Sequence, residues 1–119
     1  MEVAKTNILL RRSISELRKA ANKYKAPIWD RVAEELTKPR RRRRAVNLSR
    51  INRFTNPGDV VVVPGKVLAA GKLDHPVTVA SFSFSRIALE KIQNSGGRAI
   101  HILDLVKENP TGKGVKIIG

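Results

Sequence analysis

Four consecutive valines at positions 60–63 constrain the fold of this chain more strongly than any other feature of its sequence. They lie between two Pro-Gly pairs, at residues 57–58 and 64–65, and such pairs favour turns. Valine is β-branched and favours strands, whose side chains point alternately to two faces. Because this strand is apolar on both faces, both must be covered. The sequence therefore predicts a short buried strand, at which the packed core begins.

Strand and helix signals alternate after this strand. Residues 77–84 read "VTVASFSF", in which an alternation of valines gives way to phenylalanines in the other phase. This change predicts either a strand with a bulge or a strand that runs into a helix. Residues 86–95 predict a helix that Ser83 or Ser85 caps and that Gly96 ends.

Two further segments complete the predicted sheet. Residues 98–106, "RAIHILDLV", predict a strand followed by a turn, and residues 115–118, "VKII", predict a short final strand. A strand, a helix and a strand at this spacing predict a parallel crossover unit. The fold class expected for the chain is therefore α/β, in a single small domain.

Two amphipathic helices are predicted before the arginine-rich segment. The first covers residues 6–24, with Thr6 or Asn7 as its N-cap. The second begins at Pro27 and carries Trp29 on its core face, and Pro39 ends it. The apolar face of the first helix consists of Leu10, Ile14, Leu17 and Ala21. Its other face carries Arg11, Arg12, Arg18, Lys19 and Lys23.

The charge of the chain is strongly positive and uneven. Its 24 lysines and arginines face 10 aspartates and glutamates, which gives a net charge of +14. Residues 1–60 carry 16 basic and 6 acidic side chains, and residues 61–119 carry 8 and 4. Like charges repel one another in a compact protein, so this excess predicts a polyanionic partner such as nucleic acid or an anionic membrane. We expect the first half of the chain to make the contact.

The charge is densest in residues 37–53, "TKPRRRRRAVNLSRINR", which contain no acidic residue. A basic block can be a solvated tail or a localisation signal. This one lies between a predicted helix and a predicted core, and its "AVNLSRINRF" part indicates an extended arm or edge strand. Arginine predominates over lysine, and its planar guanidinium group can hold a phosphate bidentately or stack on a base. The segment is expected to order along an RNA backbone.

The predicted organisation has three parts: a basic helical region at residues 1–37, an Arg-rich RNA-binding arm at 38–56 and an α/β core at 57–119. Cations of the first helix and of the core loops are expected to reach phosphates as well. The residues predicted to contact RNA are Lys38, Arg40, Arg41, Arg42, Arg43, Arg44, Asn47, Ser49, Arg50, Arg53, Arg11, Arg12, Lys66, Lys72 and Lys113.

The sequence predicts no catalytic, metal or cofactor site. "GKVLAAGKL" has some likeness to a phosphate-binding loop, but five residues separate Gly65 from Gly71 where that motif requires four. Leu73 also stands where Ser or Thr would ligate magnesium. His75 and His101 have no cysteine or acidic cluster at metal-ligand spacing.

The absence of cysteine suits a reducing compartment and excludes a disulfide framework. The apolar stretches are far shorter than the ~18 residues that a membrane-spanning helix needs. The expectation is a soluble, intracellular protein that lies in the cytoplasm, with neither a membrane nor a small-molecule substrate as its partner.

Four segments, "ELTKPRRRRRAVNLSRI", "GDVVVVPGKVLAAGKL", "FSFSRIALEKI" and "GGRAIHILDLV", resemble the archaeal large-subunit ribosomal protein eighteen-e family. Its superfamily includes the bacterial large-subunit ribosomal protein fifteen. The resemblance covers nearly the whole chain and is most specific from Pro39 to Ile51. A small residue is more usual in the family at the position of Arg44, and the departure adds charge.

The resemblance implies an α/β domain of irregular β-β-α turns with basic extensions, embedded in the large ribosomal subunit. It further implies contacts with large-subunit ribosomal RNA and with neighbouring ribosomal proteins, and no catalytic role. The leading hypothesis is therefore a structural ribosomal protein. Charge alone also allows an architectural DNA-binding or chromatin protein, since both polyanions attract cations. An RNA-modifying enzyme is a third hypothesis, for which the sequence offers no nucleophile, metal set or cofactor loop.

Overall fold

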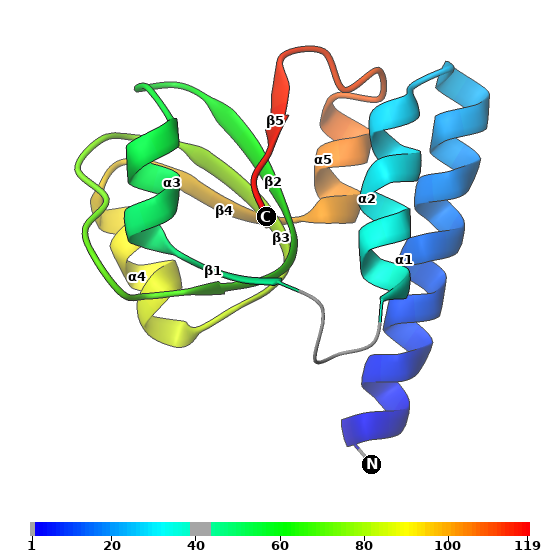
Figure 1. The fold of residues 1–119 in the computed structure, drawn as a ribbon, viewed down its shortest axis with the longest axis horizontal. Coiled ribbons are helices and arrows are strands. Elements are labelled where there is room, and N and C mark those ends of the chain that lie inside the picture. Colours follow the sequence, from blue (N-terminus) through cyan, green and yellow to red (C-terminus); the bar gives the residue numbers. More distant parts are fainter. Residues whose placement is uncertain (1, 39–43) are drawn as a thin grey trace.

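A five-stranded parallel sheet runs through the molecule, with helices on both of its faces (Figure 1). The computed structural model describes residues 2–38 and 44–119. In chain order the elements are α1 (Glu2–Tyr24), α2 (Pro27–Thr37), β1 (Arg44–Asn47), α3 (Leu48–Phe54), β2 (Val60–Leu68), β3 (Thr78–Phe84), α4 (Arg86–Asn94), β4 (Arg98–His101), α5 (Ile102–Glu108) and β5 (Val115–Ile117). This arrangement confirms the predicted α/β class.

β2 makes more strand pairs than its neighbours. β3 pairs with one edge of β2 from Val60 to Val67. β5 and β1 divide the other edge, with β5 beside residues 60–62 and β1 beside residues 65–68. β4 extends the sheet beyond β3. Because β3 and β4 are parallel and α4 connects them, the predicted crossover unit is confirmed.

The pairing of β2 with β3 contains an irregularity. Val63 lies opposite Ser81 and Lys66 lies opposite Ser83, so β2 has one residue more than β3 between these pairs. The extra residue falls at the Pro-Gly pair of residues 64–65, where proline cannot donate to a regular ladder. A bulge was predicted for the β3 segment, and the structure places the extra residue in its partner strand.

β3 then leads directly into α4, which is the other predicted outcome for this segment. Ser85 is the N-cap, and its hydroxyl oxygen accepts a hydrogen bond from the Ala88 N–H at 3.2 Å. Gly96 follows the helix with a φ of +87°, a left-handed conformation that glycine adopts without a steric penalty. Both ends of α4 therefore agree with the prediction.

The valines of β2 are buried on both faces, as predicted. Val61, Val62 and Val63 have no exposed surface. Val62 packs in a cluster with side chains of α1, α2 and α5, whereas Val61 and Val63 pack in a cluster with α3 and α4. Since strand side chains alternate between faces, one short run of valines contributes to both cores.

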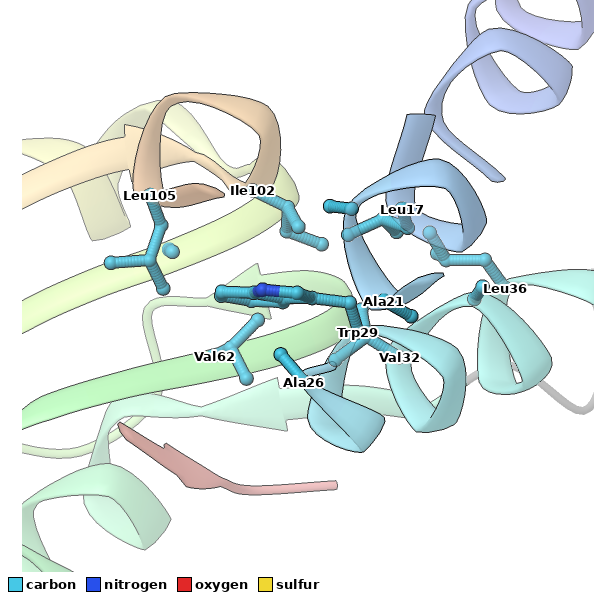
Figure 2. Close-up of a cluster of buried hydrophobic side chains, with 12 residues drawn as sticks. Leu17, Ala21, Ala26, Trp29, Val32, Leu36, Val62, Ile102 and Leu105 are labelled. Atoms are coloured by element: carbon cyan, nitrogen blue, oxygen red, sulfur yellow. The ribbon is translucent and has the colours of Figure 1, made fainter. Parts of the chain in front are cut away.

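Trp29 lies in the middle of the first of these cores (Figure 2). Its side chain is fully buried, and its indole Nε1–H donates a hydrogen bond to the Pro110 carbonyl oxygen at 2.7 Å. Leu17 of α1, Leu36 of α2 and Ile102 of α5 belong to the same cluster. The prediction that Trp29 is a core residue is confirmed, and its hydrogen bond ties α2 to the segment that follows α5.

The segment after the arginine run departs from the prediction. Residues 44–47 form an edge strand, as one of the expected alternatives had it, but residues 48–54 form the helix α3 and are not extended. The physical reason lies in the burial pattern, because Leu48 and Ile51 are one helical turn apart and both are fully buried. α1 also begins earlier than predicted, at Glu2, so that neither Thr6 nor Asn7 is its N-cap.

Residues 102–108 form the helix α5, where a turn was predicted. His101 is its N-cap, and the imidazole Nδ1 accepts a hydrogen bond from the Leu103 N–H at 3.1 Å. A ring nitrogen that accepts cannot carry a proton, so the cap requires neutral His101. Burial lowers the pKa of His101, and the nearby Asp104 carboxylate opposes this shift. Burial and the cap therefore both favour the neutral ring.

Replacing Trp29 with phenylalanine should lower the free energy of unfolding by about 1–3 kcal/mol, because the variant loses buried volume and leaves the Pro110 carbonyl without its donor. Denaturant titration followed by circular dichroism measures this change. Tyr24→Phe is the control, since Tyr24 is exposed on α1 and its change should stay within about 0.5 kcal/mol. Equal effects of the two substitutions would contradict the central position of Trp29.

The His101 cap should make stability depend on pH. The pKa of His101 in the folded protein lies below its ordinary value of 6.5, so the unfolded chain takes up the proton first as the pH falls. This contribution is complete above pH 6.5 and is lost as the pH falls through and below it. Asparagine also caps helices, so His101→Asn should remain folded without this dependence. Unfolding titrations from about pH 8 to about pH 5 measure the difference, and parallel curves for the two proteins would refute the role.

Candidate nucleic-acid interface

The arginine run enters the sheet through β1. The predictions for Arg40, Arg41, Arg42 and Arg43 fall outside the described residues, and the described chain resumes with the backbone of Arg44 at the start of β1. On the other side of the run, Lys38 is the C-cap of α2, and its ammonium group forms an ion pair with the Glu35 carboxylate. In the chain, α2 therefore precedes the arginine run and β1 begins at its last residue.

α3 contains the second part of the basic segment, which we define as residues 37–53, and one face of this helix is buried. Leu48 and Ile51 point into the core between α3 and the sheet. Ser49, Arg50 and Arg53 are exposed. Because residues three and four apart share a helix face, burial of the apolar pair leaves the polar side chains on the outer surface. α3 thus anchors a cationic surface to the core.

The loop of residues 69–77 packs against the start of α3. The Ser49 N–H donates a hydrogen bond to the Ala70 carbonyl oxygen at 3.1 Å. Gly71, with a φ of +91°, approaches so closely that a Cβ atom there would lie 2.3 Å from the Ser49 Cβ. The exposed Lys72 follows this contact directly. The fold therefore brings Lys72, Ser49 and the start of α3 together, although 23 positions separate Lys72 from Ser49 in the sequence.

Lys91 of α4 holds this loop in place from the other side. Its ammonium Nζ donates hydrogen bonds to the carbonyl oxygens of Ala69, at 2.9 Å, and Gly71, at 3.0 Å. A lysine that is occupied in this way differs from Lys72, whose side chain points into solvent. Of these two cations near α3, we therefore assign a structural role to Lys91.

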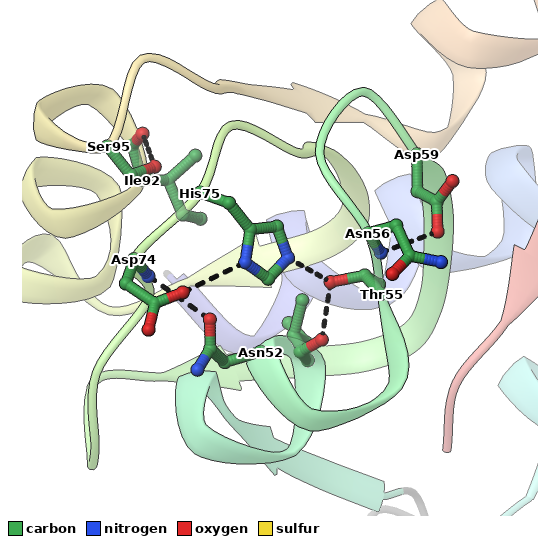
Figure 3. A network of polar contacts seen from close by, with 9 residues as sticks. Asn52, Thr55, Asn56, Asp59, Asp74, His75, Ile92 and Ser95 are labelled. Atoms are coloured by element: carbon green, nitrogen blue, oxygen red, sulfur yellow. Dashed lines mark hydrogen bonds and ion pairs between the residues drawn. The ribbon is translucent and has the colours of Figure 1, made fainter.

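The carboxylates beside α3 have partners of their own (Figure 3). Asp74 accepts a hydrogen bond from His75 Nδ1 at 3.0 Å, which lowers the pKa of Asp74, with a smaller contribution from Asn52. The Thr55 hydroxyl donates to the Ile51 carbonyl oxygen at 2.7 Å, and His75 Nε2 lies 2.7 Å from the same hydroxyl oxygen, within hydrogen-bond distance. This network ties the C-terminal end of α3 to the loop at residues 74–75.

Asp59, at the start of the β2 region, is engaged in the same way. It accepts hydrogen bonds from the Asn56 backbone N–H at 2.9 Å and from Lys116 Nζ at 2.8 Å, and these contacts lower its pKa. Both acidic side chains near α3 are therefore ionised and paired within the fold. Arg50 and Arg53 have no ion pair with an Asp or Glu side chain among the described residues.

Phe54, the last residue of α3, is an exposed aromatic side chain that the sequence prediction did not select. Its ring is 52% exposed, and the guanidinium carbons of Arg50 and Arg53 lie 5.2 and 5.7 Å from its centroid. These distances are those of cation–π contacts. The signal was present in the sequence as an aromatic residue directly after Arg53, inside the predicted arm of residues 38–56.

The remaining predicted residues lie in two places. Lys66 is exposed on β2, where Ala45 of β1 is its register partner, and Asn47 ends β1 half-buried, so both lie near the basic segment. Arg11 and Arg12 are exposed on α1, which Figure 1 shows at the opposite end of the molecule from α3. Lys113 is exposed in the turn before β5, next to Gly112, which contacts Ile28 of α2.

Arg12 also lines a groove of about 590 Å³ between α1 and α5. Its apolar lining includes Leu9 and Leu103, and Lys23 and Lys107 lie along it. Among the described residues, members of the predicted RNA-binding set therefore lie around β1 and α3, at the end of α2, on α1 and in the turn before β5.

Within residues 2–38 and 44–119, no three histidine, cysteine or acidic side chains are grouped so that they could hold a metal ion. No helix in the same residues has the length and hydropathy to cross a membrane. The fold and its surface define a small, strongly basic α/β protein with cations concentrated along one segment and the helix that follows it.

Comparison with known proteins identifies the family. Residues 5–119 match the family described as "Ribosomal protein 60S L18 and 50S L18e". The chain is 50% identical over 113 residues to large ribosomal subunit protein eL18 of Sulfurisphaera tokodaii, which covers 95% of this chain and 92% of that protein. It is 45% identical over 117 residues to the eL18 protein of Methanothermobacter thermautotrophicus, covering 98% and 97%. It is also 46% identical over 114 residues to that of Archaeoglobus fulgidus, covering 96% and 97%.

The chain belongs to this family of large-subunit ribosomal proteins. The resemblance drawn from the four sequence segments is thereby confirmed over nearly the whole chain.

The contrast between Lys91 and Lys72 is testable. Lys91→Met should lower the free energy of unfolding by about 1–2 kcal/mol, because two loop carbonyls lose a charged donor. Lys72→Met removes the same charge from an exposed side chain and should change stability by less than about 0.5 kcal/mol. Fluorescence of Trp29, the single tryptophan, follows unfolding in both variants. If Lys72→Met were the more destabilising change, the assignment of the two roles would be wrong.

Proposed function

We propose that this protein is a structural constituent of the large ribosomal subunit that binds and stabilises large-subunit ribosomal RNA through its basic segment, in the cytoplasm. The observation that carries the proposal is the concentration of cations without acidic neighbours in residues 37–53 of a chain that belongs to a ribosomal protein family. Neighbouring large-subunit proteins are its further partners. The role is non-covalent, since RNA is held and not changed.

In the proposed mechanism, the folded core positions α3 and the arginine run contacts the RNA. The sheet and its helices fix the position of α3, and the packing of Leu48 and Ile51 fixes which side of α3 faces outward. The arginines from Arg40 to Arg44 then neutralise phosphates that would otherwise repel one another when RNA helices come together. Guanidinium groups suit this task because each can engage a phosphate through two hydrogen bonds.

The two groups of predicted residues have different parts in this proposal. The primary contact comprises Lys38, the arginine run, Asn47, Ser49, Arg50, Arg53, Lys66 and Lys72. Arg11 and Arg12 lie on α1 and Lys113 in the turn before β5, and none of these elements is α3, so we assign these residues to a separate stretch of RNA. Residues 38–56 thus act as the RNA-binding unit, residues 57–119 as the core that holds it and residues 1–37 as a second basic surface.

The salt dependence of RNA binding tests the mechanism. Lys38, Arg40–Arg44, Arg50 and Arg53 are eight cations, so the slope of log affinity against log salt should be on the order of −6 to −7. Replacing the five arginines of the run by alanine should flatten the slope by about 4, because five counterions are no longer displaced. Filter binding to large-subunit ribosomal RNA over a range of salt concentrations measures both slopes.

A control with the same loss of charge replaces Arg18, Lys19, Lys23, Lys25 and Arg31, all exposed on or between α1 and α2. If this variant flattens the slope as much as the arginine-run variant does, the net charge and not the arm governs binding. Duplex DNA as competitor separates ribosomal RNA binding from general affinity for polyanions. Equal competition by DNA would favour the architectural DNA-binding hypothesis and contradict the proposed function.

A further inference from the structure

Phe54 stands outside the buried stripe of its own helix. The stripe runs through Leu48 and Ile51 and is completed by Thr55, which is only 8% exposed. Those positions follow the i, i+3, i+7 spacing of a helix face. Thr55 is thus buried although it is polar. Its hydroxyl donates a hydrogen bond to the Ile51 carbonyl oxygen and lies within hydrogen-bond distance of His75 Nε2. The adjacent aromatic ring is left in solvent.

The surroundings of the ring are cationic. Arg50 and Arg53 each place a guanidinium within cation–π distance of Phe54, and Arg50 Nη2 also donates a hydrogen bond to the Gly119 carbonyl oxygen at 3.4 Å. The large apolar side chains that are exposed elsewhere in the described residues lie on α1 and α4. Arg53, directly before Phe54, and Asn56, two residues after it, are exposed and polar. An isolated ring among cations differs from the contiguous apolar patch that a protein partner requires.

We propose that Phe54 is a stacking platform for an unpaired base of RNA, with Arg50 and Arg53 at the phosphates on either side of that nucleotide. The inference rests on the proposed function and deepens it by naming the kind of nucleotide bound. A base has a π face that an aromatic side chain covers, and a guanidinium can hold the phosphate of the same nucleotide. Bases inside a duplex already stack on their neighbours, so the platform selects nucleotides of loops, bulges or ends.

The geometry provides for both parts of this contact. The end of α3 at Phe54 is held to the core by buried Ile51 and by Thr55, the C-cap, whose hydroxyl bonds the Ile51 carbonyl oxygen. One Arg50 nitrogen donates a hydrogen bond to the Gly119 oxygen, and the guanidinium lies beside the ring. The carboxylates of Asp59 and Asp74 are paired with His75 or Lys116, so neither engages Arg50 or Arg53.

Substitution at Phe54 distinguishes stacking from charge. Phe54→Leu keeps an apolar side chain and removes the π face, and it should weaken binding to large-subunit ribosomal RNA roughly five- to 150-fold at fixed salt without changing the salt slope. Phe54→Trp, which keeps a π face, should bind within about threefold of the wild type. Arg53→Ala should instead flatten the salt slope by about 1. Circular dichroism melts confirm that the variants are folded.

A fully paired RNA duplex of the same length provides the matched ligand. The wild type should prefer ribosomal RNA with unpaired nucleotides, and Phe54→Leu should lose most of that preference. If Phe54→Leu binds ribosomal RNA as tightly as the wild type while both retain a steep salt slope, stacking is overturned and the proposed function survives. If the wild type itself binds ribosomal RNA without salt dependence, both fail. If Phe54→Leu impairs only incorporation into subunits, the ring contacts a protein and the inference is again overturned.

Discussion

The burial of β2 on both faces is the constraint from which the rest of the architecture follows. Val62 must be covered on one side and Val61 and Val63 on the other, so helices are needed on both faces of the sheet. α1, α2 and α5 supply one cover, and α3 and α4 supply the other. α3 is therefore required by the core, although it lies within the basic segment. This requirement makes residues 48–53 of that segment part of a packed helix.

The same constraint explains which predictions from sequence were correct. Continuous valine has one physical outcome, a doubly covered strand, whatever lies around it. Ser85 and Gly96 act within a few residues of the helix that they bound, so local chemistry was sufficient to place α4. Trp29 was assigned to the core because its helical spacing matched that of other apolar residues, and its burial confirms this.

The errors came from elements whose identity depends on distant residues, as for α3, or on an unusual local signal, as for α5. Leu48 and Ile51 are two apolar residues in a short segment, and their spacing fits a helix only once the sheet and the loop of residues 69–77 are present to cover them. α5 depends on a histidine cap at His101, a residue type that seldom signals a helix start. In the candidate interface, the cations were selected from their density, whereas Phe54 required knowledge that Thr55 takes the buried position.

The ion pairs show which charged side chains stabilise the fold and which remain on the surface. The Glu108 carboxylate accepts hydrogen bonds from both terminal nitrogens of Arg98, at 3.0 and 2.8 Å. This contact lowers the pKa of Glu108 and raises that of Arg98. Asp59 and Asp74 are likewise paired with Lys116 and His75. Acidic residues are few in this chain, and Glu108 and Asp59 serve contacts that connect separate elements, whereas Asp74 pairs with its neighbour in the loop of residues 69–77. At the proposed RNA contact, Arg50, Arg53 and Lys72 have no ion pair with an Asp or Glu side chain among the described residues.

A run of arginines alone gives affinity but no fixed position, because phosphates repeat along every strand and each is equivalent to the next. A segment that bound only through such contacts would slide along the RNA. Position requires an element that is rigid in the protein and a feature that is rare in the RNA. α3 meets the first condition because its inner face is packed into the core. An exposed ring that accepts an unpaired base meets the second, since unpaired bases occur at defined places in a folded RNA. In this chain the helix that the core requires is therefore also the element that can set the register of the arginines.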